Sequence, residues 1–227
     1  MKLKLTAKFV LTFLALTFVM HEAHEIVHTT IGRLICGCWG QRDFNVWGLC
    51  EGCSEQNPYS IISTFVGPIF TFIMIWVGTA LIGKTKSENQ KALGFSLIFA
   101  NIPFARILTA SMGAGDEVWG LNQVLKNYSL AWTIGLIIIL AITIVPLYKS
   151  FKIIENKRRI GWFLLFFLAP TFIDLLLVLG LMNTLLEKGL LSNYWVLGSP
   201  IIVTVWTVLV TLIYLLTRKN IYTLVRK

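Results

Sequence analysis

All three histidines of this 227-residue chain fall within eight positions, between His21 and His28. On a helix, residues three, four and seven positions apart share one face. One helix face therefore carries four ionisable side chains: His21, His24, Glu25 and His28. His24 and His28 stand one turn apart, a spacing that allows two imidazoles to bind one zinc ion. Glu25 is then placed to act as the catalytic general base toward a water molecule that the ion activates.

The segment that carries this cluster is long and apolar, which predicts that the cluster lies in a membrane. Hydrophobic residues make up 56% of the chain and charged residues only 14%, against about 25% in a typical soluble domain. A helix needs about 20 mainly apolar residues to cross the hydrocarbon core. Six segments meet this requirement: 8–31, 60–82, 92–112, 129–148, 160–182 and 196–217. We predict an all-α, polytopic membrane helix bundle with about six transmembrane helices, in one domain over residues 1–227.

The basic residues beside these segments predict how the chain is oriented. Lys2, Lys4 and Lys8 precede the first segment, but no small-residue cleavage site follows, so we expect an uncleaved helix rather than a signal peptide. With the N-terminus in the cytoplasm, 15 of the 20 Lys and Arg residues lie on the cytoplasmic side. We therefore expect both termini in the cytoplasm, in a bacterial inner membrane. The net charge of +9 lies in these clusters and not along one polar face, so we predict no nucleic-acid partner.

Ionisable groups at membrane depth are costly unless they are partnered or functional. His24 lies 16 residues beyond Lys8, about 24 Å along a helix and thus within a hydrocarbon core of about 30 Å. Zinc held by two histidines needs a third protein ligand, typically a carboxylate. Asp116 follows the third segment beside glycines that let the chain fold back toward the metal, whereas Asp174 in the fifth segment matches the depth of His24. The alternative is a structural cluster whose polar groups contact lipid headgroups.

Two motifs resemble those of the site-2 protease family of intramembrane zinc metalloproteases, with this chain as a distant relative. They are His24-Glu25-Ile26-Val27-His28 in the first span and Asn101-Ile102-Pro103-Phe104 two spans later. The resemblance implies that His24 and His28 bind zinc and that Glu25 is the catalytic base. It also implies that Asp116 is the third ligand and that Asn101 positions substrate or water. A metalloprotease core over residues 1–120 would then precede three further spans within residues 121–227.

The chain departs from the family pattern in two respects. Asp116 lies 15 residues beyond Asn101 and outside a Pro-Asp-Gly-like turn, and the charge pattern places the metal nearer the outer face. The supporting residues also have structural interpretations. Asn101 and Pro103 can mark a kinked helix, and Arg106 can extend to the interface, pair with Asp116 or Asp174, or bind a substrate carbonyl. Of these roles for Arg106, pairing is favoured.

All four cysteines lie in the loop at residues 32–59, which the orientation places outside the cytoplasm. They are Cys36, Cys38, Cys50 and Cys53. Disulfides persist outside the cytoplasm, and four cysteines allow three pairings. A structural zinc site is the alternative, but a C-x-C half followed by eleven residues is not a usual zinc pattern. We predict two disulfides, in a loop whose aromatic residues, such as Trp39 and Trp47, lie at the headgroup level as a stapled cap or a lid.

Together these features favour an enzyme, a zinc metallopeptidase that hydrolyses peptide bonds within or beside the membrane. Membrane lipid surrounds it, and its substrate is a membrane protein or peptide. A membrane di-iron oxygenase is disfavoured because its site needs histidines spread over several helices. The alternative is a non-catalytic polytopic membrane protein that binds or transports a metal or a proton. The sequence carries no signal for the oligomeric state.

Overall fold

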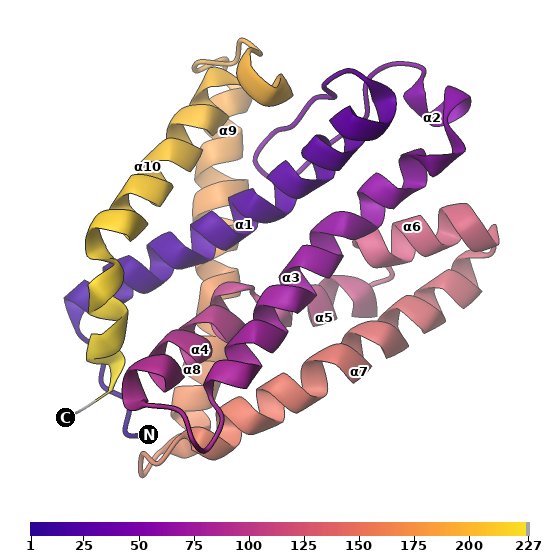
Figure 1. The fold of residues 1–227 in the computed structure, drawn as a ribbon. Helices are drawn as coiled ribbons and strands as arrows, with labels where there is room; N and C mark the ends of the chain where they lie inside the picture. The colour runs from indigo at the N-terminus through magenta and orange to yellow at the C-terminus, as the bar shows by residue number, and fades with distance from the viewer. Residues whose placement is uncertain (226–227) are drawn as a thin grey trace.

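Long apolar helices make up most of the fold. In the computed structural model, which describes residues 1–225, six helical segments are long and apolar enough to cross a membrane. They are Ala7–Cys36, Pro58–Leu81, Glu88–Ser111, Tyr128–Ile153, Arg159–Glu187 and Ile201–Leu224. Within the described residues the only β-structure is isolated bridges. The predicted all-α bundle of a multi-pass membrane protein is confirmed (Figure 1).

The first helix, α1 (Ala7–Cys36), runs through the middle of the bundle (Figure 1). It begins where the Thr6 side chain accepts a hydrogen bond from the Phe9 amide, and it ends at Gly37, whose φ of 77° is left-handed. Its 30 residues span about 45 Å, more than the hydrocarbon core. Helices α3 (Ile62–Leu81), α4 (Glu88–Ala100) and α10 (Ile201–Thr217) pack against it. The histidine cluster therefore lies inside the protein, with helices available on several sides to supply partners.

The third span is a broken helix. Helix α4 ends at Ala100 and α5 (Pro103–Ser111) begins two residues later, because Ile102 adopts a left-handed φ of 48° and Pro103 starts the next helix. Beyond Ser111, the left-handed conformations of Gly113 and Gly115 turn the chain back. Residues 116–125 then form helix α6 (Asp116–Leu125), which packs against α3 and α7 (Tyr128–Ile153). This segment lies between two of the predicted spans, and it forms a helix that returns Asp116 toward α1.

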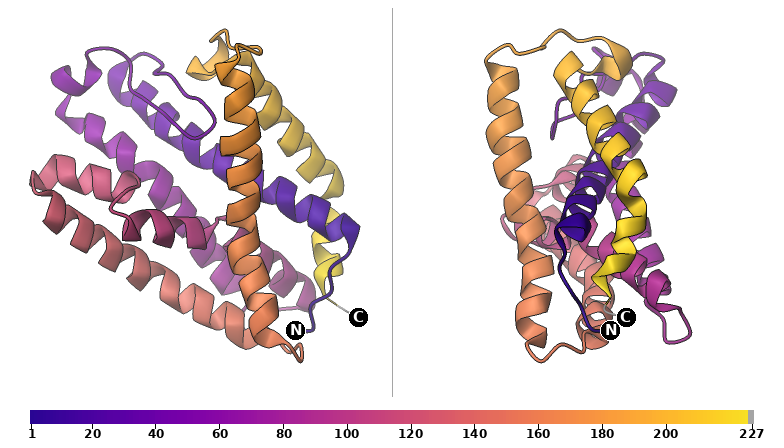
Figure 2. Two further views of the ribbon diagram at one scale, coloured as in Figure 1. Left: turned by 180° about the vertical axis from the view of Figure 1, so that it is seen from behind. Right: turned by 90° about the vertical axis from the view of Figure 1, so that its left-hand side faces the viewer.

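The last two spans complete the bundle. Helix α8 (Arg159–Asp174) continues through a π-helical stretch (Leu175–Met182) into α9 (Asn183–Glu187). This column crosses behind α1 in the view of Figure 1 and in front of it in the left view of Figure 2. Helix α10 ends in a 3-10 turn (Arg218–Leu224). Leu3 pairs with Val225, so both ends of the described chain lie at one end of the bundle (Figure 2). The even number of candidate spans agrees with that arrangement.

The cysteines lie at the opposite end of the bundle from the termini. Cys36 pairs with Cys53 and Cys38 with Cys50, with Cα–Cα distances of 5.6 and 6.0 Å. These distances are normal for disulfides, so the predicted disulfides are confirmed, and the structure selects one of the three pairings. The two bonds hold residues 37–52, here called the cysteine loop, between α1 and the short helix α2 (Cys53–Gln56).

A buried ion pair ties the cysteine loop to the helices. Arg42 Nη1 donates to Glu22 Oε2 of α1 over 2.8 Å, and both residues are only 2% exposed. The Arg42 Nε group donates to Ser199 Oγ, and the Thr207 hydroxyl donates to Glu22 Oε2. Arg42, which lies in the loop at residues 32–59, is thus a fully buried anchor that joins this loop to α1 and α10.

We predict that Glu22→Ala lowers the free energy of unfolding by about 3–5 kcal/mol, because it leaves the buried Arg42 without a counter-charge. Denaturant unfolding in detergent micelles measures this change. Glu88→Ala is the matched control, since it removes the carboxylate of an exposed pair with Lys91 and should change stability by less than about 1 kcal/mol. Equal losses in the two variants would contradict the anchoring role.

Candidate metal centre

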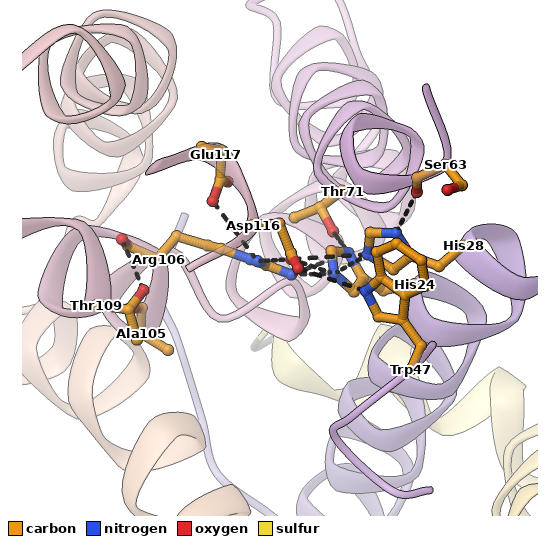
Figure 3. A network of polar contacts seen from close by, with 10 residues as sticks. All are labelled: His24, His28, Trp47, Ser63, Thr71, Ala105, Arg106, Thr109, Asp116 and Glu117. Carbon is orange, nitrogen blue, oxygen red and sulfur yellow. Dashed lines mark hydrogen bonds and ion pairs between the residues drawn. The ribbon is translucent and has the colours of Figure 1, made fainter. Parts of the chain in front are cut away.

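Three side chains from two helices converge at one point in the bundle. His24 and His28 lie one turn apart on α1, and Asp116 is the first residue of α6. The His24 and His28 Nε2 atoms are 3.1 Å apart. Asp116 Oδ2 lies 3.2 Å from His24 Nε2 and 3.6 Å from His28 Nε2. These atoms therefore form a nearly regular triangle (Figure 3).

The size of this triangle can be compared with a known metal geometry. Because zinc–nitrogen bonds are about 2.0–2.1 Å long, ligand atoms at the corners of tetrahedral zinc stand about 3.3–3.4 Å apart. The three measured distances bracket that value. Two imidazoles and a carboxylate are also a donor set found in sites that keep one position open. The cluster can therefore hold a metal ion with three protein ligands.

Helix α3 orients both imidazoles. The Nδ1 atom of His28 lies within hydrogen-bond distance of the Ser63 carbonyl, and Nδ1 of His24 lies 2.9 Å from Thr71 Oγ1. A carbonyl oxygen only accepts, so the His28 Nδ1–H must donate, which leaves the Nε2 lone pair of a neutral ring free for a metal. The same tautomer of His24 places both Nε2 lone pairs in the triangle. Neither Ser63 nor Thr71 had a signal in the sequence, because both lie in an apolar span among other small hydroxyl residues.

His28 is fully buried between α3 and the cysteine loop. A Cβ atom on Gly67 would overlap the imidazole of His28, so only glycine permits this close approach of the two helices. On the other side, Trp47 stacks on the His28 ring with centroids 4.4 Å apart and planes at 9°. Its indole Nε1–H points to Asp116 Oδ1 at 3.5 Å. Trp47, expected at the headgroup level, therefore covers the cluster (Figure 3).

Arg106 of α5 supplies a positive charge beside the cluster. Its Nη1 atom lies 3.2 Å from Asp116 Oδ2, so Arg106 pairs with Asp116 rather than Asp174. Its Nη2 atom also lies 2.7 Å from His24 Nε2. A guanidinium donor and a metal ion cannot share that lone pair, so metal binding requires Arg106 to move away from His24. Glu117 offers an alternative acceptor, because its Oε2 is 4.0 Å from Arg106 Nη1 and both its oxygens lack hydrogen bonds within residues 1–225.

The two adjacent carboxylates of α6 have opposite electrostatic environments. Burial by itself would raise the pKa of Asp116, but hydrogen bonds with His24 and His28 and the charge of Arg106 hold the pKa of that carboxyl well below its usual range. Burial raises the pKa of Glu117, and the charge of Arg106 only partly opposes that effect. Asp116 is therefore the ionised carboxylate, which is the form that binds a metal.

The cluster opens onto a cavity of about 350 Å³ that gathers most of the predicted site residues. Its lining includes His21, His24, Glu25, Asn101, Arg106, Asp116 and Asp174. Glu25 is 6% exposed, and its Oε2 atom has no hydrogen-bond partner within the described part of the chain. Asn101 donates from Nδ2 to the Leu97 carbonyl, while its Oδ1 has no such partner. An unpartnered Glu25 oxygen therefore lies in the same cavity as the candidate ligands His24 and Asp116.

Asp174 lies in the same cavity but in a different pair. Its Oδ1 atom is 2.8 Å from His21 Nδ1, and it does not belong to the three-residue cluster. Asp174 ends α8, immediately before the π-helical stretch, a geometry often found at functional sites. The structure thus assigns the two carboxylates that the sequence left open to different histidines, Asp116 to His24 and His28 and Asp174 to His21.

No family model, characterised protein or solved structure matches the chain. The resemblance to site-2 proteases therefore rests on the two sequence motifs.

We predict that Asp116→Ala weakens zinc binding by more than about 100-fold, beyond the effect usual for residues that only orient a ligand. The matched control is Asp174→Ala, which removes a carboxylate from the same cavity and should leave one bound zinc per chain. Competition with a chromophoric chelator measures both affinities, and the metal content of the purified protein measures the stoichiometry. Loss of zinc in Asp174→Ala with retention in Asp116→Ala would contradict this assignment.

Proposed function

We propose that the protein is a zinc-dependent peptide-bond hydrolase of the membrane. The observation that carries this proposal is the triangle of His24 Nε2, His28 Nε2 and Asp116 Oδ2, whose sides match tetrahedral zinc. Glu25 lines the same cavity with a free carboxylate oxygen, so a general base is available next to the candidate ligands. Zinc bound there would act as a Lewis acid and activate a water molecule for attack on a carbonyl.

The chain's own residues supply the proton transfers. Glu25 follows His24 directly on α1 and lines the same cavity, so its carboxylate accepts the proton of the attacking water. Protonated Glu25 then donates this proton to the nitrogen of the leaving amine. The Oε2 atom of Glu25 has no hydrogen bond within residues 1–225, so its lone pairs are available to accept this proton.

Arg106 supports the same reaction through its charge. Its guanidinium lies beside Asp116 and lines the cavity, so it can donate to the scissile carbonyl oxygen as negative charge develops there. In this role Arg106 binds a substrate carbonyl, one of the roles that the sequence suggested. The guanidinium is available for it once metal binding has displaced Arg106 from His24. Asn101, which lines the same cavity, is positioned to contact the substrate or water.

A second candidate function has one observation in its favour. His21 lies four residues before Glu25 on α1, and it forms an ion pair or hydrogen bond with Asp174 of α8 in the same cavity. Chains of carboxylates and histidines at membrane depth are typical of proton or metal transport. The two functions differ in metal stoichiometry, because transport favours weak or multiple binding and hydrolysis requires one tightly held zinc.

We also propose that the end of the bundle with both termini faces the cytoplasm of a bacterial inner membrane. The excess of Lys and Arg at this end supports the orientation, as does the position of the disulfides at the other end. Green fluorescent protein fused to the C-terminus should therefore fluoresce, and alkaline phosphatase inserted after Lys188 should be active. The reverse pattern would refute the orientation.

We predict that Glu25→Gln lowers the rate of hydrolysis of a fluorescence-quenched peptide by about 10²–10⁴-fold, the range for loss of a general base. Bound zinc should remain near one per chain, because the amide leaves the three ligands in place. Glu88→Gln makes the same substitution at the exposed start of α4, outside the cavity, and as the control it should retain full activity. Full activity in Glu25→Gln would exclude this residue as the base.

A further inference from the structure

The cavity of about 350 Å³ beside His24 and Asp116 is here called the metal cavity. A second cavity adjoins it on the side of the cysteine loop. Its volume is about 940 Å³, and its walls are the cysteine loop, the residues that lead into α3, and helix α6. The two cavities share Asn45, Trp47, Asp116 and Trp119. A molecule that lies in this groove, here called the α6 groove, therefore reaches the metal cluster without crossing the apolar helix faces.

The cysteine loop presents a free backbone edge. Arg42 and Trp47 form an antiparallel bridge, in which the Asp43 amide donates to Val46 and the Gly48 amide donates to Gln41, both over 2.8 Å. Val46 and Gly48 use their backbone groups to bond residues 41–43. Trp47 lies between them, so its own amide and carbonyl point away from residues 41–43. Within residues 1–225, neither the Trp47 nor the Leu49 amide donates a hydrogen bond, although both residues line the α6 groove. The edge is therefore available to an added strand.

The length and charge of the α6 groove narrow the class of ligand. Its lining along α6 extends from Asp116 to Lys126, about 15 Å of helix, which matches four or five residues of an extended chain. Asp116 is already paired with Arg106, but Glu51 and Glu55 on the other wall still outnumber Lys126. The groove is thus acidic within a protein of net charge +9, so it attracts a basic segment, admits a neutral one and repels an acidic one.

We propose that the α6 groove binds an extended, basic or neutral polypeptide segment of the substrate, which pairs with the backbone of the cysteine loop and leads into the metal centre. This inference rests on the proposed hydrolase function. It assigns the substrate class as an extended peptide that arrives from the cysteine-loop end, not a lipid and not a helix that enters sideways from the bilayer. Trp47 belongs to both cavities, so the segment would pass directly over the residue that covers His28.

The test measures binding without hydrolysis, in the full-length Glu25→Gln protein in detergent. The probe is a fluorescein-labelled twelve-residue peptide of alternating Thr and Val with Lys at each end, and binding is read by fluorescence anisotropy. Val124→Trp fills the groove and should weaken binding at least tenfold, because Val124 lines it. Leu125→Trp places the same indole at the next residue, which does not line the groove, and should change affinity less than twofold.

Backbone pairing has its own readout in the peptide. N-methylation of one alternate set of amides should weaken binding at least tenfold, and methylation of the other set should not. Replacement of the terminal Lys residues by Glu should also weaken binding. Absence of binding, equal effects of the two Trp variants, or indifference to both methylations would each overturn the proposal. Displacement of the peptide by phospholipid, with methylation harmless, would assign the groove to lipid and overturn it as well.

Failure of the groove proposal and failure of the hydrolase proposal give different results. Zinc-dependent hydrolysis that Val124→Trp leaves unchanged would overturn the groove assignment and leave the hydrolase intact. Peptide binding with the predicted dependence on Val124, but without any zinc-dependent hydrolysis, would support the groove and refute the hydrolase.

Discussion

The structure depends on the need to satisfy ionisable groups that α1 carries into the membrane. A charge or imidazole at that depth is costly unless a protein group pairs with it or it faces a polar cavity, as Glu25 does. Glu22 pairs with Arg42 of the cysteine loop, His21 pairs with Asp174 of α8, and His24 and His28 face Asp116 of α6. Three separate segments of the chain are thus bound to one helix by polar contacts.

This requirement explains the irregular parts of the fold. Non-helical backbone at membrane depth is tolerated only where protein buries it or where it lines a cavity. The break at Asn101 and Ile102 lies on the metal cavity, as does Gly115, which starts the return of α6. The cysteine loop reaches the same cavity through Asn45 and Trp47. The irregular backbone is therefore concentrated where it delivers polar groups to α1.

The same arrangement links stability to the proposed chemistry. Disulfides and the buried Arg42 hold the cysteine loop in place, and the loop holds Trp47 against His28. Arg106 lies between two acidic residues of α6, one ionised and paired, the other buried without hydrogen bonds. This gives the guanidinium two acceptors, so it can neutralise Asp116 or turn toward Glu117.

The sequence by itself determined the six spans and the one-faced cluster of histidines and Glu25 on α1, because hydropathy and helical periodicity are local properties. It also restricted the cysteines to disulfides or a zinc site, and it left Asp116 and Asp174 as the two candidates for a third metal ligand. Tertiary structure alone decided that Asp116 joins His24 and His28, while Asp174 joins His21. It also selected the disulfide pairing and brought Thr71, Gly67 and Trp47 to the histidines. These outcomes depend on how far α6 folds back and how closely α3 approaches α1, and no local pattern in the chain encodes a distance between helices.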